Sequence, residues 1–297
     1  MSSCPKNLKA TTDNKYILLG EPLGDGISSE VYKALDSLTG KEYALKLFKK
    51  NYDNSDEIKI NKIISQFDNP SFIKCIDHSK EYIVFELCKG DIFKYVEKLK
   101  NDKLIKFIIF KILKAVQFLH QKGICHRDLK TENIFLANDY SLKIGDFGQS
   151  ISFLNENNQK IFLKESCGTQ RYKAPEIIYN CAYNGEKIDI FSIGVIFFSI
   201  KFKIFPFAEA THGDKAYKCI IKKDKENFWK IVEGRLKQIP KFSKEFETLF
   251  FNMVSFQPIK RPTIEEILNE SYMKEVSSLD DSCLKELEQN LNDEGGI

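Results

Sequence analysis

The hydrophobic pattern of this 297-residue chain changes once, at the break Lys89–Asp91, and that change limits the folds the chain can adopt. Before the break, short runs rich in β-branched and aromatic residues predict strands, with one helical patch, EIKINKII, among them. After the break, apolar residues recur at three- and four-residue spacing, most clearly over Leu104–Gly123, where the final glycine is typical of a helix end. The pattern predicts an α+β chain: a small β-rich lobe with one helix, followed by a larger, mostly helical lobe.

The predicted elements follow from these two spacings. The predicted strands lie within YILLGEPL (16–23), EVYKAL (30–35), KEYALKLF (41–48), SFIKCID (71–77) and EYIVFEL (81–87). Further helices are predicted at Asp189–Ile200, Tyr217–Ile221, Lys244–Phe251 and Thr263–Leu268.

The composition is that of a chain that can bury a large core without metals or disulfides. Hydrophobic residues make up 42% and charged residues 29%, a balance that excludes disorder as the main state. The formal charge of +3 is too small to indicate a nucleic-acid or membrane partner. This net charge is the sum of two opposite contributions: the segment from Val276 onward carries −5 and the rest of the chain carries +8.

The eight cysteines are scattered and form no CxxC pair, which indicates neither a metal cluster nor a redox motif and favours a reducing compartment. The N-terminus lacks the apolar core of a signal peptide, and the longest apolar run, Ile190–Ile200, is shorter than the roughly 20 residues that a spanning helix needs. We therefore expect a cytoplasmic monomer, with the nucleus left open as a second location, that has no membrane span and no nucleic-acid partner.

Two motifs in the β-rich part carry chemistry only in combination with others. In LGDGISSEVY (23–32), two glycines let the backbone approach phosphate oxygens, although a hairpin turn is the commoner explanation for such a pair taken by itself. Lys46 shares a strand face with Ala44 and Phe48, and the alternative for a strand lysine is a solvated surface position.

Three later segments decide between these alternatives. They are ICHRDLKTENIF (124–135), KIGDFG (143–148) and GTQRYKAPE (168–176). With these motifs in this order, the chain resembles the eukaryotic protein kinase family from about Tyr16 to Met273. DIFSIG, FPFAEA and ENFW are also similar to calcium/calmodulin-kinase-like sequences of ciliates. The resemblance implies a two-lobed kinase fold with an N-terminal extension (1–15), an N-lobe (16–88), a C-lobe (89–273) and an acidic C-terminal tail (274–297).

The resemblance implies ATP and Mg²⁺ as cofactors. The positions it assigns to the nucleotide are Leu23, Gly24, Gly26, Val31, Ala44, Lys46, Glu86, Cys88 and Asp91. Glu86 and Cys88 present backbone groups to the adenine next to the bulky Phe85, and Asp91 meets the ribose or a basic substrate side chain. The third glycine of the family pattern is Ser29 here, which we expect to be tolerated if its hydroxyl faces solvent.

The catalytic assignments rest on the same motifs. Asp128 is the candidate base for the substrate hydroxyl, Lys130 steadies the transferring γ-phosphoryl group, and Lys46 contacts the α- and β-phosphates. Asp146 and Asn133 supply oxygen ligands to Mg²⁺. Further carry-overs are structural: Asp189 braces the catalytic loop, and Glu176 and Arg261 form a buried ion pair.

The acidic partner of Lys46 is open between two registers. Glu57 lies at the start of the helical patch, but a gap-free count back from Pro70 puts Ile60 at the usual position. Either the following loop is three residues longer or the pair is displaced by a helical turn. We expect Glu57 to be the partner, since the i, i+3 spacing keeps it on nearly the same face as Ile60.

Lys130 and Thr169 resemble the serine/threonine branch, which implies protein substrates with serine or threonine acceptors. Glu132 and Asp91 could attract a basic residue of the substrate, and Ser199 occupies another position where relatives with this preference often carry an acid. Arg127 usually implies control by a phosphate on the activation segment. The usual phosphorylated position is Glu165, so we expect Glu165 to pair with Arg127 in place of a phosphate, with Ser166 as the competing site.

The expected function is an ATP- and magnesium-dependent serine/threonine protein kinase in intracellular signalling. The alternative is a pseudokinase, a scaffold that binds nucleotide or partners without catalysis. A nucleotide-binding metabolic enzyme would need a different glycine fingerprint. The acidic tail, with a leucine stripe at Leu284, Leu287 and Leu291, is either a solvated end or a segment that docks on the kinase body or a partner.

Overall fold

An antiparallel five-stranded sheet and one helix form the N-terminal lobe of the computed structural model, which describes residues 10–50, 52–99, 101–236, 242–274 and 276. The strand order is β1-β2-β3-β5-β4. The bounds of these elements are β1 Tyr16–Asp25, β2 Ser29–Asp36, β3 Glu42–Phe48, α1 Ser55–Gln66, β4 Cys75–His78 and β5 Tyr82–Glu86. Residues 1–9 of the predicted extension and 277–297 of the predicted tail lie outside the described residues.

The two faces of this sheet differ because side chains alternate along each strand. One face carries a small apolar core in which Tyr16, Tyr32, Leu45 and Tyr82 are buried. On the other face, Gly24 of β1 lies opposite Val31 of β2, Val31 opposite Lys46 of β3, and Lys46 opposite Ile83 of β5. The strand register therefore puts the glycine motif and Lys46 on one side of the sheet.

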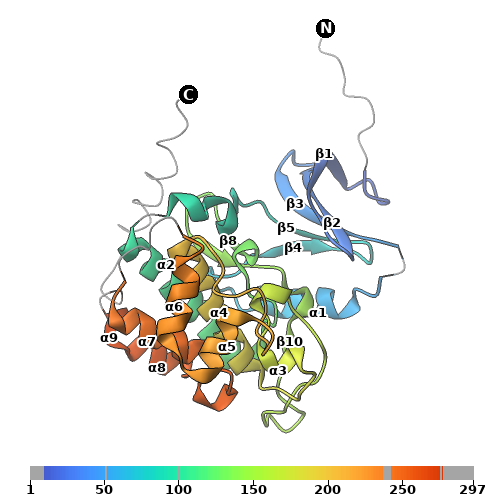
Figure 1. The fold of residues 1–297 in the computed structure, drawn as a ribbon. Coiled ribbons are helices and arrows are strands. Elements are labelled where there is room, and N and C mark those ends of the chain that lie inside the picture. The colour runs from blue at the N-terminus through green and yellow to red at the C-terminus, as the bar shows by residue number, and fades with distance from the viewer. Residues whose placement is uncertain (1–9, 51, 100, 237–241, 275, 277–297) are drawn as a thin grey trace, which may run out of the picture.

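The second lobe is mostly helical, and Figure 1 shows its helices gathered on the other side of the molecule from strands β1–β5. α4 is buried on nearly all sides at its centre and packs against α2 and α7. Among the described residues, no helix is long and apolar enough to cross a membrane. The helices are α2 Asp102–Gln121, α3 Pro175–Ile178, α4 Gly185–Phe202, α5 Lys215–Lys222, α6 Lys225–Glu233, α7 Lys244–Met253, α8 Ile264–Asn269 and α9 Ser271–Lys274.

Short elements join the lobes and carry the loops of the site. The strands are β6 Gly90–Asp91, β7 Ile124–Cys125, β8 Ile134–Leu136, β9 Leu142–Ile144 and β10 Ile151–Ser152. The 3₁₀ helices are η1 Ile92–Lys98, η2 Thr131–Asn133, η3 Phe147–Gln149, η4 Gln170–Tyr172 and η5 Pro258–Lys260.

The two-lobed α+β architecture is as predicted, while some elements differ in extent. The run 71–77 supplies strand structure only from Cys75, because Phe72 and Ile73 turn into the interior instead. α6 was not predicted, although Phe228, Trp229 and Val232 are buried at helical spacing behind the cap Asp224. The one-turn helices α3 and α9 are too short to give a periodic signal.

A buried ion pair fastens the C-lobe at the junction of α3, α4 and η5. Arg261 is 1% exposed and donates to both carboxylate oxygens of Glu176, from Nη1 to Oε1 at 2.6 Å and from Nη2 to Oε2 at 2.7 Å. Its Nε donates to the carbonyl of Ser255, and its guanidinium lies 4.9 Å from the ring centre of Phe191. The planar fork of arginine suits this bidentate geometry, which one lysine ammonium could not reproduce.

Removal of one partner should destabilise the protein strongly. We expect Glu176→Ala to lower the free energy of unfolding by about 3–5 kcal/mol, because the arginine charge is left buried without a counterion. Urea unfolding followed by tryptophan fluorescence measures this.

The matched control is Glu186→Ala, which breaks the more exposed pair with Lys160 at 2.7 Å. That change should lower the free energy of unfolding by less than about 1 kcal/mol. Equal losses in the two variants would contradict the structural role of Glu176.

Candidate active site

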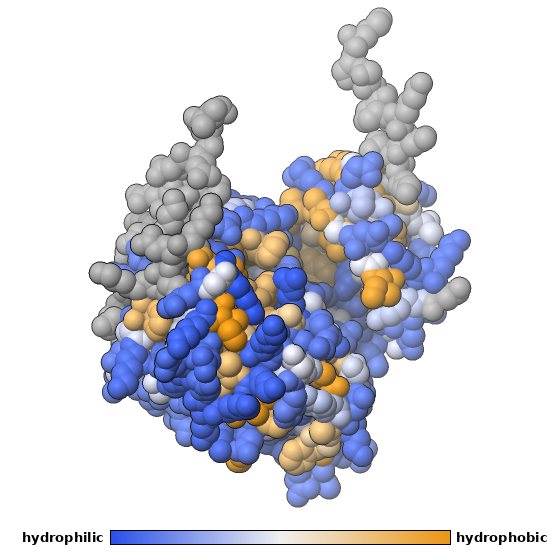
Figure 2. Space-filling model, in the orientation of Figure 1, coloured by the Kyte–Doolittle hydropathy of each residue, from blue (hydrophilic) through white to orange (hydrophobic). Residues whose placement is uncertain are grey.

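The site lies where the glycine-bearing face of the sheet meets the loops of the C-lobe, and Figure 2 shows the surface hollowed between the two lobes. In the strand register, Ala44 of β3 lies opposite Phe85 of β5. It is two residues from Lys46, which lies opposite Val31, so the three side chains are on one face of the sheet. The sheet thus brings Gly24, Val31, Ala44 and Lys46 together, four of the nine positions predicted for the nucleotide.

Lys46 is the charged centre of this face. Its Nζ contacts Oε1 of Glu57 at 2.5 Å and Oδ1 of Asp146 at 2.9 Å, and its side chain is 12% exposed. Burial disfavours the charged ammonium, but the two carboxylates outweigh that effect and raise the pKa of Lys46 above its usual value. Burial also disfavours the charged form of Asp146, yet Lys46 keeps the pKa of this carboxyl below its usual value.

The contact with Glu57 settles the register that the sequence left open. α1 places Glu57, 5% exposed, against Lys46, while Ile60 packs into the apolar core one turn further on. The prediction that Glu57 is the partner of Lys46 is confirmed. Gly148 lies so close that a Cβ there would come within 3.0 Å of Glu57 Oε2, so α1 packs directly on η3.

The catalytic loop brings three side chains into mutual contact. Asp128 accepts a hydrogen bond from Lys130 Nζ at 2.9 Å on Oδ2 and one from Thr169 Oγ1 at 2.8 Å on Oδ1. Lys130 Nζ also donates to Thr169 Oγ1 at 3.0 Å. Thr169 was predicted only as a marker of the serine/threonine branch, and its contact with the candidate base depends on a fold that brings together positions 41 residues apart.

Asp189, near the start of α4, holds the backbone of the catalytic loop in place. Its carboxylate accepts the backbone N–H of His126 and that of Arg127, both at 2.9 Å, and contacts Nε2 of His120 at 2.8 Å. It is 1% exposed. The predicted brace is therefore present, and it fixes the backbone on either side of Arg127, whose φ is +67°.

Asn133 and Asp146 offer oxygen atoms that suit a hard cation. The Asn133 amide nitrogen donates to the Asp128 carbonyl at 2.8 Å, which leaves the amide oxygen as the atom that can face a cation. Asp146 uses Oδ1 for Lys46 and retains Oδ2. Its φ of +56° is rare outside glycine, and the next residue, Phe147, is buried between Phe72 and His126.

The predicted adenine contacts lie on the segment that joins the lobes. Among the described residues, no hydrogen bond uses the N–H or the C=O of Cys88, whereas the flanking Lys89 N–H is bonded to the Leu136 carbonyl. The Glu86 carboxylate accepts a hydrogen bond from Lys143 Nζ at 2.8 Å. Asp91 caps η1 by accepting the Lys94 N–H, so its carboxylate is already partly engaged.

The glycine motif forms the turn between β1 and β2. Leu23 is 58% exposed, and no heavy atom lies within 4 Å of a Cβ built on Gly24, so the loop is open above the sheet. The Gly26 N–H donates to the Ser29 carbonyl. Ser29, which we expected to be tolerated in place of the third glycine if its hydroxyl faced solvent, is 6% exposed, because it begins β2 and pairs with Phe48 of β3.

Arg127 reaches the activation segment. Its Nη1 contacts Glu165 Oε2 at 3.3 Å and the Tyr183 hydroxyl at 3.1 Å, and its Nε donates to the Gln149 carbonyl. The predicted pair with Glu165 is present. Tyr183 was missed, since its hydroxyl also donates to the Glu165 carbonyl from 18 residues away and no local pattern signals this.

Two residues predicted to contact the substrate, Ser199 and Glu132, form hydrogen bonds within the protein instead. Ser199 is 6% exposed within α4 and donates to the Ile196 carbonyl, because α4 is the core helix of the lobe. It therefore cannot meet a substrate. Glu132 lies near the loop but accepts hydrogen bonds from the hydroxyls of Thr131 and Tyr172.

The chain is similar in sequence to known proteins. Residues 18–273 match the family model described as "Protein kinase domain". The curated relative "Mitogen-activated protein kinase 5" of Arabidopsis thaliana is 30% identical over 303 residues, which cover 90% of this chain and 79% of the relative.

Two other relatives are longer than the match. "Serine/threonine protein kinase OSK3" of Oryza sativa subsp. indica is 32% identical over 263 residues, covering 84% of this chain and 48% of the relative. "CBL-interacting serine/threonine-protein kinase 14" of Arabidopsis thaliana is 30% identical over 283 residues, covering 91% and 61%. The chain thus spans most of the first relative and about half of the rice one.

The pair between Lys46 and Glu57 generates a stability prediction that needs no nucleotide. Lys46→Met should lower the free energy of unfolding by about 3 kcal/mol, because Glu57 is left buried without its counterion. The double variant Lys46→Met/Glu57→Leu should recover part of this loss, since the buried charge of Glu57 is gone and an apolar pair fills the space, while only the more exposed Asp146 is left without the ammonium.

Urea unfolding of the wild type, both single variants and the double variant gives the coupling energy. Additive losses in the double variant would show that the two side chains do not stabilise each other.

Proposed function

Since the chain belongs to the protein kinase family and to its serine/threonine branch, we propose that it transfers the γ-phosphoryl group of ATP to serine and threonine hydroxyls of protein substrates. Members of this family generally use ATP and Mg²⁺. The observation that carries the proposal is the junction of Asp128, Lys130 and Thr169 beside the ammonium of Lys46 and the carboxylate of Asp146.

Asp128 is the group that receives the substrate hydroxyl. Its two carboxylate oxygens are held in place by Thr169 and Lys130, so its position is fixed before a substrate arrives. A serine or threonine hydroxyl that donates to this carboxylate presents its oxygen for attack on phosphorus, and its proton passes to Asp128. Lys130, 2.9 Å from the same carboxylate, supplies positive charge to the phosphoryl group as it moves.

Lys46, Asp146 and Asn133 bind the polyphosphate end of the nucleotide. The Lys46 ammonium donates to phosphate oxygens while Glu57 holds it in place from α1. Asp146 Oδ2 and the amide oxygen of Asn133 would hold Mg²⁺, which offsets phosphate charge when bound. The turn at Gly24 leaves room for these phosphates above the sheet, because no heavy atom lies within 4 Å of a Cβ built there.

The adenine binds against Val31 and Ala44. The free N–H and C=O of Cys88 supply one donor and one acceptor to its edge, and the Glu86 carbonyl supplies a second acceptor. The Glu86 side chain takes no part, because Lys143 holds it outside the pocket. Phe85 lies opposite Ala44 and limits the depth of the site.

The test of catalysis is the substitution Asp128→Asn. We expect phosphate transfer from radiolabelled ATP to a generic protein substrate to fall by about 10²–10⁴-fold, because the amide cannot accept the proton. Nucleotide affinity should change little, since Asp128 contacts the acceptor and not the adenine.

Asp139→Asn is the matched control, because Asp139 caps an exposed turn, where its Oδ1 accepts from the backbone N–H and the hydroxyl of Ser141. It should leave transfer unchanged. Equal transfer by wild type and Asp128→Asn, or nucleotide binding without transfer in the wild type, would replace the kinase with the pseudokinase alternative.

We also propose that Glu165 gives the enzyme activity without phosphorylation of the activation segment. Its carboxylate stands 3.3 Å from Arg127, in the position of the phosphorylated residue of relatives, and the Tyr183 hydroxyl fixes its backbone carbonyl at 2.9 Å. Hydrogen bonds from the local backbone and the charge of Arg127 keep the pKa of Glu165 below its usual value, so the carboxylate stays charged at neutral pH.

Phosphatase-treated wild type should therefore remain active, and Glu165→Ala should lower kcat by about two- to fivefold, the range expected for a single exposed ion pair. Ser166→Ala is the control and should match the wild type. If the phosphatase-treated protein is inactive and Ser166→Ala is equally inactive, control lies at Ser166 and Glu165 has no such role.

A further inference from the structure

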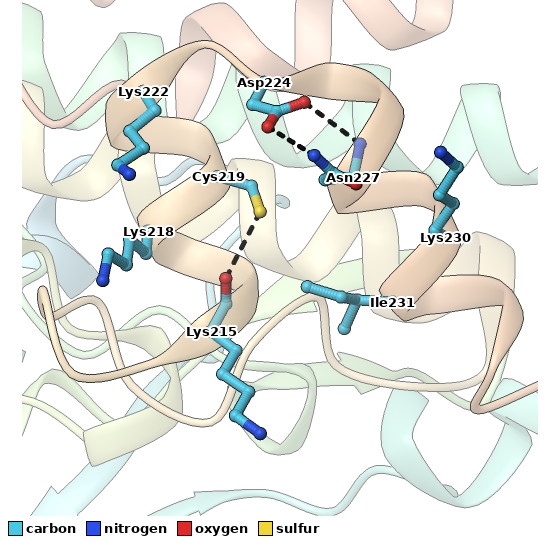
Figure 3. A pocket seen from close by; sticks show the side chains of 8 residues that line it. All are labelled: Lys215, Lys218, Cys219, Lys222, Asp224, Asn227, Lys230 and Ile231. Carbon is cyan, nitrogen blue, oxygen red and sulfur yellow. Dashed lines mark hydrogen bonds between the residues drawn. The ribbon is translucent and has the colours of Figure 1, made fainter.

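A basic pocket lies between α5 and α6, on a part of the C-lobe that contributes nothing to the proposed active site. Its volume is about 390 Å³, and Figure 3 shows the lysine side chains around its rim. The residues that line it are Lys215, Lys218, Cys219, Lys222, Asp224, Asn227, Lys230 and Ile231.

The positive charge of this pocket is largely uncompensated. Lys215, Lys218 and Lys222 recur at helical spacing along α5, which puts them on one face. Within the described part of the chain, none of the three forms an ion pair, whereas Lys230 is paired with Glu226 at 2.6 Å. The one carboxylate that lines the pocket, Asp224, is occupied as the cap of α6 and accepts from the backbone and side-chain nitrogens of Asn227.

The pocket also has an apolar component. Ile231 and Cys219 are partly buried and lie between the lysines of α5 and Lys230 of α6, and the Cys219 thiol is turned towards the Lys215 carbonyl at 3.4 Å. A fitting ligand therefore carries several negative charges together with apolar side chains. A peptide segment with both kinds of residue has this chemistry, and a small inorganic anion lacks the apolar part.

We propose that this basic pocket is the docking site of the chain's own residues 277–297. This segment carries six acids against one lysine, a net −5, and places Leu284, Leu287 and Leu291 among them. It complements the pocket in both charge and apolar content.

The helices between the pocket and the start of this segment put the two within reach. Trp229 of α6 donates to Glu247 of α7 at 2.7 Å, and Phe246 of α7 packs against Tyr272 of α9. Taking 8–10 Å for each of these two steps between helices, the axes of α6 and α9 lie at most about 20 Å apart. The described chain ends at Val276, which is buried against Phe107, and six to seven extended residues from there span about 20 Å.

Covalent attachment favours this segment over an acidic peptide of another protein. A tether of this length gives an effective concentration of the order of millimolar, so weak rim contacts suffice to fill the pocket. Cys283 lies seven residues beyond Val276, where docking would bring it close to Cys219.

The two cysteines provide the test in the full chain. A short bismaleimide reagent, followed by proteolysis and mass spectrometry, should join Cys219 to Cys283. In an equal mixture of unlabelled and nitrogen-15-labelled protein, the cross-linked peptides should be wholly light or wholly heavy, because the link is within one chain.

Charge reversal makes the test specific. The triple change Lys215→Glu/Lys218→Glu/Lys222→Glu should lower the yield of the link by about tenfold. Reversal of Asp280, Asp281, Glu286 and Glu288 to lysine in the same protein should restore it. Monomaleimide labelling of both thiols and an unchanged melting temperature show that each variant is folded and reactive.

Several results would overturn the proposal. They are the absence of the link while both thiols label, a yield that charge reversal does not change, and mixed light and heavy peptides. The last result would assign the pocket to a second copy of the chain. If no link forms and other proteins displace a labelled polyglutamate peptide bound to the wild type, the pocket belongs to an acidic partner.

Discussion

The contact of one ammonium with two carboxylates from different lobes underlies the rest of the site. Lys46 lies on β3, Glu57 comes from α1 of the small lobe, and Asp146 comes from the loop after β9. Lys46 and Glu57 could not be held at their positions alone, because their side chains are 12% and 4% exposed and each charge would be poorly solvated there. Together they set the position of α1, the direction of the Asp146 carboxylate and the closure of the lobes around the nucleotide space.

A similar principle holds the large lobe together. Its buried ionisable side chains are bonded to partners that match them: Arg261 has Glu176, and Asp189 has two backbone N–H groups and a histidine. These anchors lie at the ends of α3 and α4, directly beneath the catalytic loop. The apolar body of α4 is packed in the core and is therefore rigid. Asp189, near its start, binds the backbone of the catalytic loop and so fixes the orientation of Asp128.

The fold and the core of the site could be predicted from the sequence because their signals are local. Alternation gave the strands of the sheet, helical spacing gave α2, α4 and α7, and the motifs gave Asp128, Asn133 and Asp146 positions that the structure brings together. The choice between Glu57 and Ile60 needed the length of a loop, which no periodicity encodes. Tyr183 and the burial of Ser29 and Ser199 depend on which segments pack together, and α6 shows that a short amphipathic helix beside another is easily overlooked.

The absence of a side chain at Gly148 has a mechanical consequence. Because a Cβ there would come within 3.0 Å of the Glu57 carboxylate, the helix rests on the bare backbone of the loop that carries Asp146. A rotation of that loop cannot leave α1 where it is, and an outward swing of α1 removes the surface against which the loop is folded. The loop and α1 therefore move together, so any event that displaces one of them also displaces the other.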